Sequence, residues 1–181
     1  MKKVFLFLAT GFEETEAIGT ADILRRGGVD VTTISITGDL TVTGAHHLPI
    51  VADRLFEDVD YSTADALVLP GGGPGSQMLN NHNGLKQLLV RHCEQNKLIA
   101  AICAAPLVLG GLGLLNGKHA TCYPGTESQL TGAILTDEPA VTDGNIITGQ
   151  GPGLVFDFGL EVLAVLAGEE TAANVANDLL L

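Results

Sequence analysis

Cys103 lies where a strand-like run meets small residues, a proline and an apolar helical run, in the stretch AAICAAPLVLGG. The neighbouring alanines permit a tight turn from strand to helix, and Pro106 is tolerated in the first turn of a helix. A thiol in such a turn faces the unpaired amides of a helix N-terminus, which favour the thiolate and lower its pKa. A purely structural cysteine is the alternative, because free cysteine is among the most buried residue types. The position favours a nucleophile.

A glycine-rich segment, PGGGPGSQ at 70–77, also follows a strand and precedes a helix. It lacks the Lys-Ser/Thr ending of a phosphate-binding P-loop. It also lacks the spacing of a dinucleotide fingerprint, because Ser76 stands where the third glycine belongs. Two interpretations remain open. The segment is either a tight turn with positive φ angles or a loop whose amides face a bound oxyanion.

Three acidic residues follow the first strand and supply a possible partner for the thiol, because a nucleophile needs a group that handles its proton. Glu13 and Glu14 fit the ordinary role of acids at a helix N-terminus. Glu16 points to a different face of the helix and is expected to turn inward, towards a ligand.

The remaining potential ligands do not form a convincing site. Cys93 and Cys122 lack the setting of Cys103, and we expect both to be structural. His46 and His47 are adjacent and diverge on an extended strand. His119 and Cys122 are three residues apart, which would place them on opposite faces of a strand. The sequence therefore predicts no dedicated metal site.

The elements that position these residues alternate between apolar strands and helices. This alternation is typical of a mostly parallel sheet covered by helices on both faces, in which ligands bind beyond the carboxyl ends of the strands. The expected strands are 3–8, 29–36, 65–69, 98–102 and 118–123, with short strands within 39–53 and a hairpin at 140–148. The expected helices are 13–26, 84–96, 106–115, 154–166 and 169–180.

Length and composition limit the class of protein. A chain of 181 residues with 46% hydrophobic and 17% charged residues is expected to form one globular domain, residues 1–181. A net charge of -12 argues against nucleic acid and anionic membranes as partners. No apolar run approaches the roughly 20 residues that span a bilayer. Three cysteines do not suggest a disulfide framework, so a reducing cytoplasm is the expected location.

Four motifs in order along nearly the whole chain resemble the DJ-1/PfpI (ThiJ/PfpI) superfamily, and its DJ-1 branch most of all. They are ATGFEETEAIGTADILRRGGVDV, LPGGGPGSQ, AAICAAP and TGQGPGLVFDFGLEVLAVLAG. The resemblance implies a flavodoxin-like three-layer α/β sandwich and a homodimer. It also implies that no cofactor is required.

The resemblance also assigns roles to single residues. Cys103 matches the family's reactive, oxidation-sensitive cysteine, and Glu16 matches the acid that hydrogen-bonds it, often as a protonated carboxyl. The amides of Gly72 and Ala104 would face the site, with Gly71 beside them. The turn formed by Gly151, Pro152 and Gly153 would lie near the pocket.

Three positions depart from the family's pattern. Tyr123 replaces a pocket histidine, Gln150 replaces an arginine, and His46 stands roughly where an arginine reaches across the dimer. The pocket therefore keeps its cysteine and acid but loses positive charge. Ala104 directly follows the cysteine, where protease-like and amidotransferase members carry a histidine or another specialised residue, so such hydrolysis is not expected.

The resulting expectation is a DJ-1-like protein whose cysteine reacts with small electrophiles. Methylglyoxal and glyoxal are the substrates that the resemblance implies, in a glyoxalase or deglycase reaction that protects against stress. The alternative is a redox sensor or chaperone-like protein whose cysteine is oxidised to sulfinic acid. In either case we expect Cys103 and Glu16 to share one negative charge, held mainly on sulfur.

Overall fold

Seven strands form the central sheet of the computed structural model, which describes residues 1–181. Neighbouring strands are parallel throughout, except for the antiparallel hairpin at one edge. In sheet order they are β10 (Ala140–Asp143), β11 (Ile146–Gly149), β7 (Leu98–Ile102), β6 (Ala66–Leu69), β1 (Lys3–Leu8), β2 (Asp30–Ser35) and β5 (Arg54–Leu55). The central strands β6 and β7 are buried along their whole length, as the near-continuous apolar runs of a parallel sheet require.

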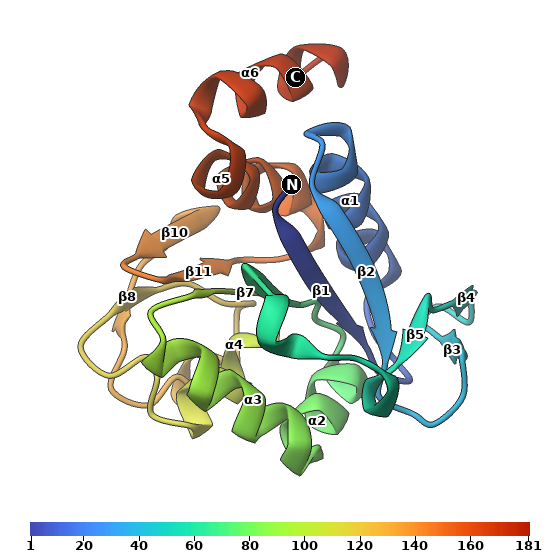
Figure 1. Ribbon diagram of the computed structural model, residues 1–181. Helices are drawn as coiled ribbons and strands as arrows, with labels where there is room; N and C mark the ends of the chain where they lie inside the picture. Colours follow the sequence, from blue (N-terminus) through green and yellow to red (C-terminus); the bar gives the residue numbers. More distant parts are fainter.

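Six helices surround this sheet in two groups (Figure 1). In the first group, α5 packs against both α1 and α6, and in the second, α2 packs against α3 and α4. The first group is α1 (Glu14–Arg26), α5 (Val155–Ala167) and α6 (Glu169–Asp178), and the second is α2 (Gly73–Asn81), α3 (Asn83–Glu94) and α4 (Pro106–Gly111). The architecture is the expected flavodoxin-like α/β sandwich, and one cluster of 47 buried apolar residues forms its core.

Strand register brings the three chemically interesting loops to one edge of the sheet. Leu6 of β1 pairs with Val68 of β6, and Leu69 of β6 pairs with Ala101 of β7. Because the strands are parallel, the loops that follow them all leave at the carboxyl edge. The alternation seen in the sequence is therefore sufficient to place Cys103, the glycine-rich loop and the acidic turn together.

Two small two-stranded sheets lie outside the main sheet. They are β3 (Thr41–Thr43) with β4 (Pro49–Val51), which are antiparallel, and β8 (His119–Ala120) with β9 (Ile134–Leu135), which are parallel. The connection between β3 and β4 is fastened to the turn before α1, because the Gly11 amide donates to the Thr43 carbonyl at 2.8 Å and the Ala45 amide donates to the Phe12 carbonyl at 2.8 Å. Residues 44–48 thus lie beside the acidic turn.

Several expected boundaries were wrong. The helix expected over 106–115 ends at Gly111, and the chain then turns through Gly113, whose φ of +73° is left-handed. The strand expected over 118–123 contains only His119 and Ala120, because the chain turns to bring the Tyr123 amide to the end of β7. The last helix ends at Asp178, two residues early.

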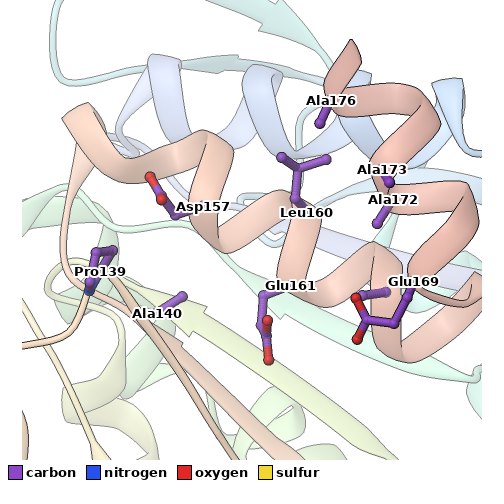
Figure 2. A pocket seen from close by; sticks show the side chains of 10 residues that line it. Pro139, Ala140, Asp157, Leu160, Glu161, Glu169, Ala172, Ala173 and Ala176 are labelled. Atoms are coloured by element: carbon purple, nitrogen blue, oxygen red, sulfur yellow. The ribbon is translucent and has the colours of Figure 1, made fainter. Parts of the chain in front are cut away.

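A groove of about 440 Å³ lies between α5, α6 and the start of β10, away from the loops at the carboxyl edge (Figure 2). Its walls are mainly alanine, with Asp157, Glu161 and Glu169 at the rim, and they contain neither cysteine nor histidine. The groove offers no nucleophile. None of the helices is both long enough and apolar enough to cross a bilayer.

Candidate active site

Cys103 occupies a strained turn between β7 and α4. Its φ of 66° is left-handed, which is unusual for a residue other than glycine and is typical of functional sites. The conformation is held from both sides, because the Cys103 amide donates to the Gly149 carbonyl at 2.9 Å and its carbonyl accepts from the Tyr123 amide at 2.8 Å. The side chain is 8% exposed, so the thiol is buried but reachable.

The glycine-rich loop lies directly against this cysteine. A Cβ at Gly71 would sit 2.5 Å from the Cys103 Cβ and 2.7 Å from Glu16 Oε2. At Gly72, φ is +89° and a Cβ would collide with the Gly11 carbonyl oxygen. The Gly72 and Ala104 amides act on the thiol and favour its ionised form. The loop is therefore a tight turn with a positive φ at Gly72, and the Gly72 amide acts on the thiol. A role for these amides in binding an oxyanion stays a prediction.

Glu16 turns inward from the first turn of α1, as its helical position predicted. Its side chain is fully buried, and its Oε2 accepts a hydrogen bond from the Gly71 amide at 2.7 Å. Its other oxygen, Oε1, is buried without a hydrogen-bond partner. Burial raises the pKa of Glu16 to about 7; the Gly71 amide and Cys103 oppose the rise, and the charge on Glu13 adds to it.

The electrostatics of Cys103 differ from the expectation based on the helix terminus alone. Burial, followed by the charge on Glu16, raises the pKa of the Cys103 thiol to about 12, although the Gly72 and Ala104 amides lower it. The helix that follows has only six residues, so its dipole is small. Helix amides by themselves do not produce a thiolate here. A thiolate requires the nearby proton to reside on Glu16.

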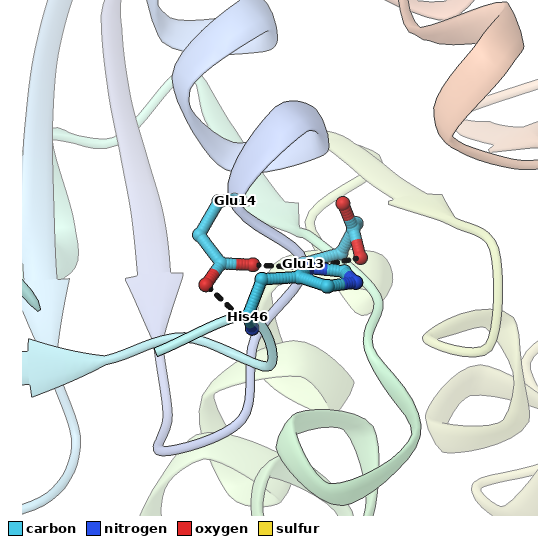
Figure 3. Close-up of side chains that lie close together, drawn as sticks. All are labelled: Glu13, Glu14 and His46. Atoms are coloured by element: carbon cyan, nitrogen blue, oxygen red, sulfur yellow. Dashed lines mark hydrogen bonds and ion pairs between the residues drawn. The ribbon is translucent and has the colours of Figure 1, made fainter. Parts of the chain in front are cut away.

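Glu13, Glu14 and His46 form a cluster at the edge of the site (Figure 3). His46 Nδ1 lies 2.9 Å from Glu14 Oε2 and 3.5 Å from Glu13 Oε2. Glu14 Oε1 also accepts from the His46 amide at 2.7 Å and from the Leu48 amide at 3.3 Å. Glu14 is only 4% exposed, so it is not the solvated helix-terminal acid that the sequence suggested. It ties residues 44–48 to α1.

The hydrogen bonds of this cluster shift two pKa values in opposite directions. Burial raises the pKa of Glu14, but the hydrogen bonds from His46 and the backbone outweigh it and lower the pKa below its usual value. The hydrogen bond to Glu14 and the charge on Glu13 raise the pKa of His46. Three potential ligand atoms lie within 4.8 Å of one another. Both oxygens of Glu14 already have hydrogen-bond partners in residues 46–48, so the cluster holds this loop against α1.

The opposite wall comes from the segments after β8 and β11. The half-exposed ring of Tyr123 lies against Gly151, where an added Cβ would approach the ring to 3.2 Å. Gln150 Nε2 donates to Asp137 Oδ1 at 2.8 Å, so its amide is already engaged. Pro152 begins the 3₁₀ turn that leads into α5.

The other two cysteines are free and lie outside this arrangement. Cys93 is half-buried in α3, where its sulfur lies 3.7 Å from Asn145 Nδ2. Cys122 is buried, and burial raises its pKa. Neither cysteine occupies a left-handed turn.

The fold and this strand-to-helix cysteine define a flavodoxin-like α/β protein with a thiol–carboxyl site at the carboxyl edge of its sheet. The chain belongs to the DJ-1/PfpI family, whose model matches residues 2–165.

Relatives align along almost the whole chain. It is 38% identical over 182 residues to protein dj-1beta of Drosophila melanogaster, covering 99% of this chain and 97% of the relative. It is 40% identical to protein DJ-1 homolog B of Arabidopsis thaliana, again over 99% of this chain. The chain spans 42% of that plant protein and 47% of DJ-1 homolog A, less than half the length of either.

Solved structures agree with the fold. The C103A mutant of the DJ-1 superfamily protein STM1931 from Salmonella typhimurium has a TM-score of 0.94 and 40% identity, and covers 99% of this chain and 98% of that chain. Oxidized Toxoplasma gondii DJ-1 has a TM-score of 0.95 and 34% identity, with 99% and 98% covered.

Proposed function

We propose that Cys103 and Glu16 act together on small carbonyl electrophiles such as methylglyoxal and glyoxal, in a glyoxalase or deglycase reaction without a cofactor. The observation that carries the proposal is Glu16 Oε1, an oxygen buried without a partner beside a cysteine in a strained turn. An unpaired buried polar atom is costly, and such atoms collect at functional sites. Membership of the DJ-1/PfpI family supports the same site.

The backbone amides favour a proton on Glu16 and a negative charge on sulfur, because two of them, from Gly72 and Ala104, lower the thiol pKa whereas one, from Gly71, binds Glu16. As a carboxylate, Glu16 accepts one hydrogen bond, from the Gly71 amide, and leaves Oε1 unsatisfied. As a carboxylic acid, Glu16 has an O–H group that can donate a hydrogen bond to the sulfur. The sulfur would then have this donor in addition to the Gly72 and Ala104 amides. Protonation also removes the Glu16 charge that raises the thiol pKa.

This arrangement accounts for the reaction as an internal redox rearrangement. The thiolate attacks the aldehyde carbon of methylglyoxal, the C–S bond forms, and the carbonyl electrons become an oxyanion that the Gly72 and Ala104 amides stabilise. Glu16 protonates this oxygen to give a hemithioacetal. Its carboxylate then moves a proton from the former aldehyde carbon to the neighbouring carbon through an enediol, while the hydroxyl proton passes to the neighbouring oxygen, which gives a lactoyl thioester. Water hydrolyses the thioester to lactate and restores the thiolate.

The position after the cysteine makes a Cys-His hydrolase a poorer fit. Ala104 offers its backbone amide but no imidazole. His46, which the sequence placed near the pocket, is hydrogen-bonded to Glu14. Glu16 is therefore the group available to handle the thiol proton.

Turnover of methylglyoxal tests this function directly. We expect wild type to consume methylglyoxal and release an equal amount of lactate, and Cys103→Ser to do neither. Glu16→Gln keeps a donor but cannot move a proton, so we expect its kcat to fall by at least about 100-fold, the usual scale of general acid–base catalysis. Cys122→Ser is the matched control and should keep wild-type turnover. Equal lactate formation by wild type and Cys103→Ser would refute the proposal.

A redox sensor is the second candidate, because a structure that closely resembles this one is that of oxidized Toxoplasma gondii DJ-1. Two equivalents of peroxide would convert the Cys103 thiolate to a sulfinate and release water, and the same amides would hold the new oxygens.

Peptide mass spectrometry after titrated peroxide tests this second candidate. We expect Cys103 to be modified first, because it alone has both the amides and Glu16. Earlier modification of Cys93 or Cys122 would contradict a role for Cys103 as the sensor.

A further inference from the structure

The charges around Cys103 suggest which electrophiles can reach it. The main charge acting on Cys103 is Glu16, and the main charge acting on Glu16 is Glu13. Neither group is a cation. The basic side chains that form ion pairs with carboxylates elsewhere, namely Lys2, Arg25, Arg26 and Lys118, are paired with aspartates outside the site.

The backbone of Glu13 contacts the glycine-rich loop beside Cys103. Its amide donates to the Gly71 carbonyl at 2.9 Å, and a Cβ at Gly72 would lie 2.7 Å from that same amide nitrogen. Glu13 therefore borders the loop that lines the cysteine. Its side chain is largely buried but still reaches solvent, with 13% exposed.

His46 does not cancel this negative charge. Its Nδ1 faces two carboxylates, at 2.9 Å and 3.5 Å, so even a protonated His46 leaves the cluster with a net negative charge (Figure 3). Gln150 follows Gly149, whose carbonyl accepts from the Cys103 amide, and its side-chain amide is hydrogen-bonded to an acid, Asp137.

The backbone amides do not provide a second anion site. Gly72 and Ala104 direct their N–H groups at the sulfur, and in the proposed reaction these groups stabilise the single oxyanion that forms there. These two amides are therefore not available to a carboxylate or phosphate elsewhere on the substrate. Such a group must remain near Glu13 in a partly buried setting, where like charges repel more strongly than in water.

We propose that Glu13 is a specificity-determining residue that makes Cys103 selective for uncharged or cationic electrophiles over those that carry a carboxylate or phosphate. The inference rests on the proposed function and deepens it by naming the class of substrate. Methylglyoxal, which carries no charge, belongs to the accepted class.

Alkylation of the whole protein by iodoacetamide and iodoacetate measures this selectivity without any turnover. The reagents are similar in size and leaving group but differ in charge. In both reactions a C–S bond forms, the C–I bond breaks, iodide leaves and the thiol proton passes to solvent. Mass spectrometry of the Cys103 peptide gives both rates, and the uncharged thiol 2-mercaptoethanol provides the reference ratio.

We expect wild type at low salt to prefer iodoacetamide at least about threefold more strongly than the reference thiol does. Glu13→Gln should lose most of this excess. Glu169→Gln, which removes the same charge from the distant rim in Figure 2, should keep it. The ratio of the iodoacetamide rate to the iodoacetate rate is the quantity compared. Glu13 also acts on Glu16, so its loss would change both rates together but leave their ratio unaffected by that change. Salt at about 0.5 M should reduce the preference in wild type even if the Glu13 variant does not fold.

A wild-type ratio equal to that of 2-mercaptoethanol would overturn the inference, as would equal ratios in Glu13→Gln and Glu169→Gln. The proposed function fails separately. If methylglyoxal is not consumed but the alkylation ratio shifts as expected, the charge selectivity stands and the glyoxalase reaction falls. If methylglyoxal is consumed but the wild-type alkylation ratio equals that of 2-mercaptoethanol, the charge selectivity falls and the reaction stands.

Discussion

At the scale of single residues, the site depends on a carboxyl group that is buried at a cost. Glu16 has no exposed surface, one hydrogen-bonded oxygen and one oxygen without a partner. Burial raises its pKa from 4.5 to about 7, so the folded protein holds a proton that the unfolded chain has lost over this interval. Because Glu16 shares this proton with Cys103, the titration belongs to the pair, and its contribution to stability is complete below pH 4.5 and is lost as the pH rises towards 7.

Glu16→Gln should therefore stabilise the protein more at pH 8 than at pH 5. The shift corresponds to a difference of up to about 3 kcal/mol in the free energy of unfolding. Urea unfolding of both proteins at the two pH values measures it, and other titrating groups cancel in the comparison. A gain that is the same at both pH values would show that Glu16 is not perturbed as described.

Residue types and spacing were enough to select Cys103 and Glu16 from the sequence, because a strand-to-helix junction and a helical face are local features. The hydrogen bonds between Glu14 and residues 46 and 48 were not predictable in this way. They join a helix to a loop more than 30 residues away, and nothing local in EETEA distinguishes a buried Glu14 from a solvated one. The pKa of Cys103 also depended on burial, which its neighbours in sequence did not reveal.

At the scale of elements, the site depends on a turn at Gly72 that only glycine can make. Gly72 combines a left-handed φ with a close approach to the carbonyl oxygen of Gly11. The alternating apolar pattern predicted the central strands, since buried parallel strands are continuous apolar runs. It did not predict where α4 and β8 end, because those ends are set by turns and by contacts with the rest of the fold.

Gly72→Ala should destabilise the protein by about 2 kcal/mol or more and reduce the reactivity of Cys103, because the strained backbone must shift. Gly73→Ala provides a matched control one residue away. It has no left-handed φ, and no atom lies within 4 Å of an added Cβ, so it should be close to neutral. Urea midpoints of the two variants give the comparison. Equal midpoints would contradict the role assigned to the turn.

At the scale of the whole molecule, exposed apolar side chains of α1 and β4 lie together around one hollow. Ile18 of α1 is 48% exposed and Val51 of β4 is 69% exposed, and both line one hollow of the surface. Leu48, at the end of the loop tied to Glu14, is also exposed. Family membership and this surface together lead us to propose a homodimer that covers α1 and β4.

Light scattering at micromolar concentration tests the dimer. We expect twice the monomer mass for wild type and a monomer for Val51→Glu, because a charge would be buried in the interface. Met78→Glu adds the same charge to α2, which packs with α3 and α4, and should remain dimeric. A monomeric wild type would refute the proposal.

The ultraviolet absorbance of the thiolate as a function of pH tests the central claim most directly, namely that Glu16 holds the proton and Cys103 the charge. The difference between wild type and Cys103→Ser reports this sulfur alone. We predict that the difference reaches its plateau below the usual cysteine pKa of about 8.5, because the pair loses its first proton from sulfur. Glu16→Asp, which shortens the reach to sulfur, should shift it upward. If wild type and Cys103→Ser absorb equally up to about pH 8.5, the charge lies on Glu16 and the account of an activated cysteine is wrong.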